Sequence, residues 1–210
     1  MSGNPIEYGK LELDEATVSK NPFAQFQKWF VDAQNSGEEE PTAMTLATVG
    51  SDGTPSARMV LMKGYSEEGF TFFTNYLSRK GRELAETPKA SLLFFWQKLE
   101  RQVRIAGMVK KVLREESNAY FQSRPLGSRL SALASIQSDV IPNRAVIEEK
   151  VKQLQEEYSN GDVPLPPYWG GYLLVPVSFE FWQGRENRLH DRLLFTKQKD
   201  GEWKIERLSP

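Results

Sequence analysis

The sequence predicts a mainly antiparallel β fold, a barrel of about eight strands with helices packed on its outside. Short runs of apolar, β-branched and aromatic residues recur along the chain, and turn sequences separate them. Helical patterns interrupt these runs, but strands and helices do not alternate in the strict order that produces a parallel sheet. A length of 210 residues favours one domain rather than two.

Composition excludes several classes of function. The net charge of −1 gives no bulk attraction to nucleic acid or to a membrane surface, so any basic site must be local. The chain has no cysteine and one histidine, which excludes disulfides, thiolate chemistry and a multi-histidine metal site. No apolar run reaches membrane-spanning length, and the N-terminus lacks the pattern of a secretion or transit signal. We therefore expect a cytoplasmic protein with no metal, nucleic-acid or membrane partner.

The first half of the chain is predicted to begin with an arm and a helix. Residues 1–20 are polar and are interpreted as a mobile arm, which leaves 21–210 as the single domain. Asn21 and Pro22 suit the N-cap and first position of a helix, and Gly37 ends it. The apolar face of this helix consists of Phe23, Phe26, Phe30 and Ala33. The pattern then predicts strands 43–49 and 56–62 joined by a hairpin turn, strand 70–75, helix 78–86, and strands 90–96 and 102–112.

The second half is predicted to be helical and then to return to strands. The helices are 114–123, 126–135 and 144–158, and the last has the clearest apolar stripe. Three prolines between 164 and 167 form a stiff connector. The remaining strands are predicted at 171–176, 178–182, 193–196 and 202–208.

The segment 179–192 is the most informative stretch of the sequence. It begins as an apolar strand that Gly184 interrupts, and a strongly polar loop then leads into a second apolar strand. A polar loop held between two core strands is typical of functional segments. Its arginines, together with Trp182 and the single histidine, His190, suit a flat, anionic, aromatic ligand.

Further basic and hydroxyl side chains gather in short clusters elsewhere. Arg79 and Lys80 stand at the start of a predicted helix, where cations are unfavourable unless an anion binds there. A solvated basic turn is the alternative interpretation. The other clusters comprise Arg58 with Lys63, Gln102 with Arg104, Tyr120 with Arg124 and Ser128, and Gln137 with Ser138. The sequence has no Walker A motif and no dinucleotide fingerprint, so any phosphate would be held by side chains of the barrel.

These clusters coincide with the motifs of a known family. The chain resembles the pyridoxine (pyridoxamine) 5′-phosphate oxidases in Arg58-Met-Val-Leu-Met-Lys63, Ser78-Arg-Lys80, Tyr120-Phe-Gln-Ser-Arg-Pro125, Gln137-Ser138, and Glu180-Phe-Trp-Gln-Gly184 with Arg188-Leu-His-Asp-Arg192. The resemblance implies a split-barrel FMN-binding fold that works as a homodimer, with both active sites at the subunit interface. It also implies oxidation of pyridoxine or pyridoxamine 5′-phosphate to pyridoxal 5′-phosphate, with transfer of a hydride from substrate C4′ to flavin N5 and reduction of O2 to H2O2.

The resemblance assigns roles to individual residues. Arg188 and His190 would lie over the substrate pyridine ring and act as the catalytic residues, and a further hypothesis makes His190 a general base. No role is assigned to Arg185. The substrate phosphate would be held by Lys63, Tyr120, Arg124 and Ser128. FMN would be held by Arg58, Met59, Val60, Leu61, Phe73, Thr74, Arg79, Lys80, Gln102, Gln137, Ser138, Trp182 and Arg192.

Two alternatives remain open at the level of sequence. One is a split-barrel flavoprotein that oxidises another substrate, such as a phenazine precursor. Such a protein should keep the flavin contacts and lose the four phosphate-binding residues, and this chain has all four. The other is a non-catalytic protein that binds FMN or pyridoxal phosphate.

Overall fold

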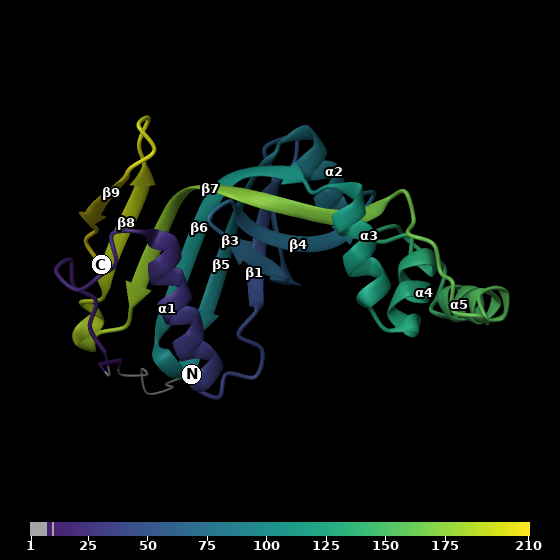
Figure 1. Ribbon diagram of the computed structural model, residues 1–210, viewed down its shortest axis with the longest axis horizontal. Helices are drawn as coiled ribbons and strands as arrows, with labels where there is room; N and C mark the ends of the chain where they lie inside the picture. The colour runs from purple at the N-terminus through teal and green to yellow at the C-terminus, as the bar shows by residue number, and fades with distance from the viewer. Residues whose placement is uncertain (1–7, 10) are drawn as a thin grey trace.

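The structure is a computed structural model that describes residues 8, 9 and 11–210. Within this part of the chain, nine strands form one sheet in which every pairing is antiparallel (Figure 1). The sheet order is β2-β1-β5-β6-β7-β4-β3, with β8 paired to β7 and β9 to β8. The strands are β1 (Ala43–Val49), β2 (Pro55–Leu61), β3 (Gly64–Ser66), β4 (Gly69–Asn75), β5 (Lys89–Trp96), β6 (Arg101–Lys111), β7 (Trp169–Gln183), β8 (Asp191–Lys197) and β9 (Trp203–Arg207). The predicted antiparallel fold is confirmed, and β3 is a short strand that the sequence pattern did not reveal.

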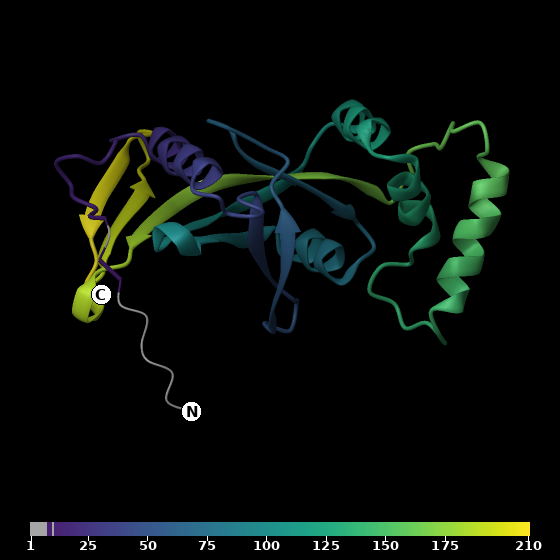
Figure 2. The ribbon, with the colours of Figure 1, turned by 90° about the horizontal axis from the view of Figure 1, so that it is seen from below.

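Strand β7 runs the length of the sheet (Figure 2). One of its edges pairs with β6 from Tyr172 to Gln183, whereas the other edge pairs first with β4 and then with β8. The prediction of two separate strands here was wrong. The register with β6 shifts so that Ala106 faces Ser178 and Gly107 faces Pro176, which leaves Val177 as the extra residue of a bulge. A bulge accommodates Pro176, which has no N–H to donate, without ending the strand.

The described part of the chain contains five α-helices. They are α1 (Pro22–Asn35), α2 (Arg79–Glu86), α3 (Arg114–Ser123), α4 (Leu126–Ala134) and α5 (Ala145–Glu157), with short 3-10 turns η1 (Gln97–Leu99) and η2 (Glu186–Arg188). Asn21 caps α1 as predicted, because its side-chain oxygen accepts hydrogen bonds from the backbone N–H groups of Phe23 and Ala24. Figure 1 shows α3, α4 and α5 together at the end of the molecule opposite β8 and β9.

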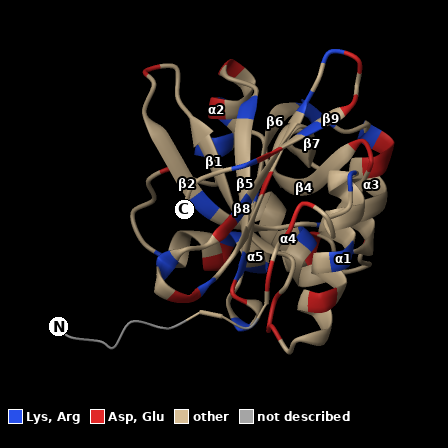
Figure 3. Cartoon of the chain, turned by 90° about the vertical axis from the view of Figure 1, so that its left-hand side faces the viewer, with Lys and Arg blue, Asp and Glu red and all other residues tan. Residues whose placement is uncertain are grey.

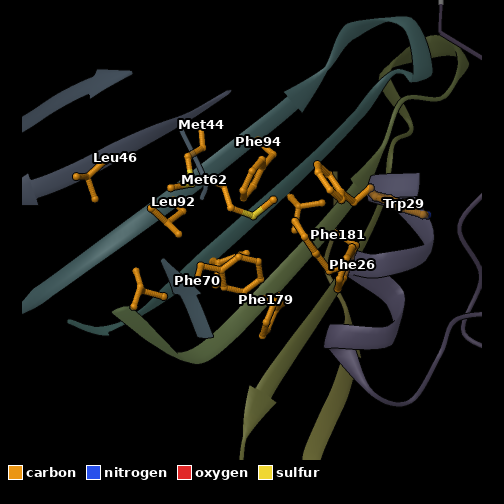
Figure 4. Close-up of a cluster of buried hydrophobic side chains, with 14 of the residues drawn as sticks. Phe26, Trp29, Met44, Leu46, Met62, Phe70, Leu92, Phe94, Phe179 and Phe181 are labelled. Atoms are coloured by element: carbon orange, nitrogen blue, oxygen red, sulfur yellow. The ribbon is translucent and has the colours of Figure 1, made fainter. Parts of the chain in front are cut away.

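The main core lies between α1 and the concave face of the sheet. Phe26 of α1 is fully buried, and its ring lies 4.8 Å from Phe70 and 5.2 Å from Phe94 (Figure 4). A second apolar cluster lies among α3, α4 and α5 and contains Phe121, Leu130, Leu154 and Trp169. The predicted stripe on α5 buries only Leu154, because this helix packs on α4 and not on the sheet.

Part of the segment predicted to be a mobile arm packs against the domain. Leu13 and Val18 are buried, and Arg207 of β9 donates a hydrogen bond of 3.1 Å to the backbone oxygen of Leu13. Arg207 also forms an ion pair of 2.6 Å with Glu15. The packed domain therefore begins before residue 21. Residues 1–7 and 10 lie outside the described part, and the mobility of the arm stays a prediction there.

Acidic and basic residues occur side by side on the face that Figure 3 shows, interspersed along the elements. None of the helices in the described part is both long enough and apolar enough to cross a membrane.

The bulge on β6 and β7 yields a stability prediction. A Cβ added at Gly107 would lie 2.1 Å from the backbone oxygen of Val175, so Gly107→Ala must push two paired strands apart. We expect the free energy of unfolding to fall by about 1–3 kcal/mol, as for other overpacked sites, measured by urea denaturation. The matched control is Gly127→Ala in α4, where a Cβ meets nothing within 4 Å and alanine favours the helix. Equal stabilities of the two variants would contradict the close approach at the bulge.

Candidate active site

A cavity of about 900 Å³ opens between β2, β4, α2, α3 and α4. It brings together residues predicted for two purposes. From the predicted cofactor set it is lined by Arg58, Met59, Val60, Leu61, Phe73, Thr74, Lys80, Gln137 and Ser138, and from the predicted phosphate set by Lys63, Tyr120, Arg124 and Ser128. Asn75, Pro125, Ser131, Ala132, Ser135 and Trp169 complete the lining.

Aromatic rings support the phosphate-binding end of the cavity. The ring of Phe73 stacks on Tyr120 at 4.0 Å and on Trp169 at 5.5 Å. The guanidinium of Arg124 lies 4.8 Å above the ring of Trp169. Its Nη1 is buried and has no hydrogen-bond partner among the described residues. Burial lowers the pKa of Arg124, although an arginine remains charged at neutral pH. A buried cationic donor without a partner is suited to bind an anion.

Glu83 of α2 organises the arginines on the opposite side of the cavity. Its carboxylate forms ion pairs with Arg58 at 3.4 Å and with Arg79 at 2.8 Å. Burial acts to raise the pKa of Glu83, but hydrogen bonds from Thr48, Ser56 and Arg79, together with the charge of Arg58, outweigh it and lower the pKa to about 2. Arg79 is thereby turned towards Glu83, and it does not line the cavity.

Lys80 faces the cavity from the first turn of α2. Its Nζ lies 3.1 Å from Oε1 of Gln137, which also accepts a hydrogen bond of 3.3 Å from the Thr74 hydroxyl. Burial, and then the charge of Arg58, lower the pKa of Lys80. Ser78 is the N-cap of the helix, because its hydroxyl accepts a hydrogen bond from the backbone N–H of Gly81.

Apart from Arg79, the remaining predicted cofactor residues form a second group on the other half of the sheet. Gln102 of β6 and Arg192 of β8 are the cross-strand neighbours of Trp182 on β7, and the three line a separate cavity of about 240 Å³. The buried carboxylate of Glu180 pairs with Arg192 at 2.9 Å and with Arg104 at 3.3 Å. Each half of the predicted site thus contains one buried carboxylate that holds two arginines.

Of the two predicted catalytic residues, His190 lies beside this second group. The His190 ring lies 4.6 Å from the Trp182 ring, and its Nδ1 accepts a hydrogen bond of 3.1 Å from the backbone N–H of Arg185. Burial, and then the charge of Arg188, lower the pKa of His190. Arg188 is exposed at the end of η2 and has a left-handed backbone, with φ of 61°.

Strand β7 keeps the two groups apart within one chain. Trp169 of the large cavity and Trp182 of the small one stand near opposite ends of this strand. At about 3.3 Å per residue, they are separated by roughly 40 Å of extended chain. The structure therefore gathers thirteen of the predicted residues in one cavity and places the others elsewhere, with Arg79 directed to Glu83.

The comparisons with known proteins match this arrangement. A family model described as pyridoxamine 5′-phosphate oxidase matches residues 30–158. The chain belongs to the pyridoxamine 5′-phosphate oxidase family. A second model, described as the C-terminal dimerisation region of pyridoxine 5′-phosphate oxidase, matches residues 169–210, which contain the second group of site residues except Gln102.

Relatives of this oxidase family cover nearly the whole chain. The pyridoxine/pyridoxamine 5′-phosphate oxidase of Burkholderia lata is 58% identical over 98% of this chain and 96% of its own length. The protein of the same name from Nostoc punctiforme is 56% identical over 94% of this chain and 92% of its own length. Among solved structures, PhzG from Burkholderia lata, in complex with tetrahydrophenazine-1-carboxylic acid, has a TM-score of 0.90 at 30% identity and covers 97% of this chain and 100% of its own. An FMN-binding protein from Nostoc punctiforme shares the fold with a TM-score of 0.71 at 20% identity, covering 91% of this chain and 99% of its own.

Sequence reasoning missed three residues that shape the site. Glu83 follows Arg79 by four residues on a helix, a spacing that could have indicated their ion pair. Glu180 is a charged residue between Phe179 and Phe181 in an otherwise apolar strand, which is a signal for a paired buried charge. Trp169 was assigned no role, because its place beneath Arg124 depends on how β7 meets α3.

The low pKa of Glu83 yields a testable pH dependence. Folding lowers this pKa from 4.5 to about 2, so the stabilisation it provides is complete above pH 4.5 and is lost as the pH falls towards 2. Glu83→Gln should therefore lower the free energy of unfolding at pH 7 by about 2 kcal/mol, since hydrogen bonds to charged groups contribute roughly 1.5–3 kcal/mol. Urea denaturation should show the wild type and E83Q converging towards pH 2.

The matched control for this experiment is Glu148→Gln. Glu148 also pairs with an arginine four residues away in a helix, but that pair is exposed. We expect E148Q to change stability by less than about 0.5 kcal/mol at any pH. A difference between E83Q and the wild type that stays constant from pH 7 to pH 2 would remove Glu83 from the role described.

Proposed function

We propose that this protein is an FMN-dependent oxidase that converts pyridoxine 5′-phosphate or pyridoxamine 5′-phosphate to pyridoxal 5′-phosphate, with reduction of O2 to H2O2. The observation that carries the proposal is the convergence of Lys63, Tyr120, Arg124 and Ser128 on one cavity, with Nη1 of Arg124 buried and unpartnered there. Two cations and two hydroxyl groups of this kind suit a phosphate monoester. The family membership and the relatives' names support the same substrate class. The cytoplasmic location is a further expectation, based on the sequence alone.

The residues present fit FMN as the cofactor. Arg58 and Lys80 supply positive charge in the large cavity, and Met59, Val60 and Leu61 offer consecutive backbone and apolar surface along β2. Gln102, Trp182 and Arg192 add an amide, a ring face and a guanidinium from the second cavity. FMN, when bound, supplies the redox chemistry by accepting a hydride from substrate C4′ and passing its electrons to O2.

The chain's own residues bind and orient the substrate. Lys63, Tyr120, Arg124 and Ser128, the phosphate anchor, hold the substrate phosphate. The rings of Phe73 and Trp169 fix the positions of Tyr120 and Arg124. Arg188 and His190 orient the pyridine ring, so that the reacting carbon is presented in one geometry. Such positioning contributes to catalysis because the reacting atoms are already close when the substrate is bound.

A complete site requires two copies of the chain. Within one chain the phosphate anchor and the His190 loop are attached to opposite ends of β7. In a homodimer related by a two-fold axis, the large cavity of one protomer can face the Trp182 group of its partner, which gives two equivalent sites. The match of residues 169–210 to a dimerisation region supports this arrangement.

The likeness to PhzG favours a second candidate function, the oxidation of a phenazine precursor. PhzG has the higher TM-score of the two structural relatives reported above, but it shares only 30% of its sequence with this chain. The relatives named as pyridoxine/pyridoxamine 5′-phosphate oxidases share 56–58%. The anchor residues also favour the phosphorylated substrate, because a tricyclic carboxylic acid has no phosphate monoester for them to hold.

Aerobic turnover is the direct test of the proposed function. Purified protein loaded with FMN is given pyridoxine 5′-phosphate, and pyridoxal 5′-phosphate and H2O2 are followed together. Equimolar formation of both is expected. Bound flavin without turnover of pyridoxine 5′-phosphate or pyridoxamine 5′-phosphate would overturn the substrate assignment. Turnover of tetrahydrophenazine-1-carboxylic acid instead would establish the second candidate. Binding of FMN or pyridoxal phosphate without any turnover would identify a non-catalytic binding protein.

The phosphate anchor is tested by Arg124→Ala. Charge-assisted hydrogen bonds contribute roughly 1.5–3 kcal/mol, so KM should rise by about one to two orders of magnitude. The value of kcat at saturating substrate should change much less, because the phosphate is remote from the reacting carbon. Arg144→Ala, at an exposed arginine with its own ion pair, is the control and should leave KM unchanged. An unchanged KM in R124A would remove Arg124 from the anchor.

The shared site is tested by combining two variants that are each impaired at low substrate concentration. R124A damages the large cavity, and His190→Ala damages the loop beside Trp182. If each site takes one half from each protomer, a mixed dimer contains one intact site and one doubly damaged site. Co-expression should then restore about a quarter of wild-type activity at low substrate concentration, from random pairing of the two variants. Activity no higher than the mean of the two parent variants would place both halves of the site in one chain.

A further inference from the structure

The loop between β7 and β8 holds its histidine through the backbone. The N–H of Gly184 donates to the backbone oxygen of Glu100 at 2.8 Å, which fixes the start of the loop. The N–H of Arg185 donates to Nδ1 of His190 at 3.1 Å. A backbone N–H is always a donor, so Nδ1 must be the unprotonated nitrogen of the ring. In the neutral imidazole the proton is then on Nε2.

The side chain of Arg185 fixes the position of this N–H. Its guanidinium forms an ion pair with Glu12 at 2.8 Å and with Asp191 at 3.4 Å. Asp191 also pairs with Arg207 at 2.7 Å and accepts a hydrogen bond of 3.2 Å from the backbone N–H of Leu13. Arg185 and Asp191 flank the loop on either side of His190, so their contact closes the loop at its base.

We propose that Arg185 is a positioning residue that holds His190 as the neutral Nε2–H tautomer, so that His190 meets the substrate as a hydrogen-bond donor and not as a general base. This inference rests on the proposed function and deepens it. A general base needs a free lone pair on Nε2, and in this tautomer Nε2 carries a proton. In the other neutral tautomer Nδ1 carries the proton, and it would face the backbone N–H of Arg185, which is also a donor. That tautomer would cost about 1–3 kcal/mol, because the backbone N–H would lose its acceptor.

The charges around His190 agree with a neutral ring. Arg188 and Arg185 lie on the same loop, and Asp191, which follows His190, is already paired with Arg185 and Arg207. Glu186 is on the same loop, and Tyr8, from the N-terminal segment, faces the imidazole at 6.0 Å between ring centres. Burial and the nearby Arg188 both disfavour the imidazolium. The neutral Nε2–H form is therefore the state expected at physiological pH.

The single histidine of the chain makes the tautomer directly measurable. In the uniformly ¹⁵N-labelled full-length protein, all imidazole signals in two-dimensional NMR come from His190. The wild type at pH 7.5 should show one neutral species protonated at Nε2. Arg185→Ala should give a mixture of tautomers and lower kcat by about tenfold, the scale expected for lost positioning, with KM changed less. Arg185→Lys should restore part of the Nε2–H population and part of kcat, because its ammonium can pair with either Glu12 or Asp191. Arg144→Ala is the control and should match the wild type.

Two substitutions of the histidine itself separate a donor from a base. In His190→Gln the amide nitrogen can occupy the place of Nε2, whereas in His190→Asn it can occupy only the place of Nδ1. A donor role predicts that H190Q retains at least tenfold more kcat than H190N. Equal loss in both variants would support the general base and overturn the proposal.

The remaining outcomes also decide the question. A wild-type ring protonated at Nδ1, or charged at pH 7.5, would overturn the proposal, as would an R185A variant with unchanged tautomer and kcat. If R185A fails to fold, the wild-type spectrum and the H190Q and H190N pair still decide it. The NMR measurement does not depend on turnover. If the protein shows the Nε2–H tautomer but does not oxidise pyridoxine 5′-phosphate, the substrate assignment is overturned and the positioning of His190 by Arg185 stands.

Discussion

Strand β7 is the constraint on which the rest of the structure depends. Its backbone pairs with β6 along one edge and with β4 and β8 in succession along the other, so three parts of the sheet meet on one strand. The strand is continuous because the bulge at Val177 accommodates a shift in its register with β6. Gly107, which has no side chain, allows the backbones of β6 and β7 to approach closely there. The same strand carries Trp169 near α3 and Trp182 beside β8. A rigid strand of this length makes it impossible for one chain to fold its two ends onto the same small ligand, which is the physical reason for a shared site in the proposed homodimer.

Repulsion between like charges is the second problem that the fold must solve. The proposed ligands are anionic, and the residues that would bind them place several cations close together in each half of the site. Glu83 and Glu180 each hold two arginines in fixed positions through ion pairs at the edge of the core. A buried carboxylate surrounded by donors stays ionised, as the pKa of Glu83 shows. The arginines are thereby kept in place without a ligand, and less conformational entropy is lost when one binds.

The N-terminal segment contributes to the site by a route that its composition did not suggest. Leu13 enters the core, and Arg207 and Asp191 hold the backbone around it. Because Asp191 also contacts Arg185, the packing of residues 12–15 reaches the loop that carries Arg188 and His190. The site at this end therefore depends on contacts between the beginning of the chain and its last two strands.

The sequence by itself determined the local elements and the family. Apolar residues that recur every two or every 3.6 positions located the major strands and helices, because burial of one face imposes these periods. The oxidase family was identified from the motifs between Arg58-Met-Val-Leu-Met-Lys63 and Arg188-Leu-His-Asp-Arg192. Only the tertiary structure decided how these motifs are distributed. Proline in 171–182 looked like a strand end, because a bulge depends on the partner strand and leaves no periodic signal. The buried surroundings of Arg124 Nη1 likewise depend on segments that are distant in sequence. The hydrogen bond to Nδ1 of His190 depends on a turn geometry that residue types do not specify.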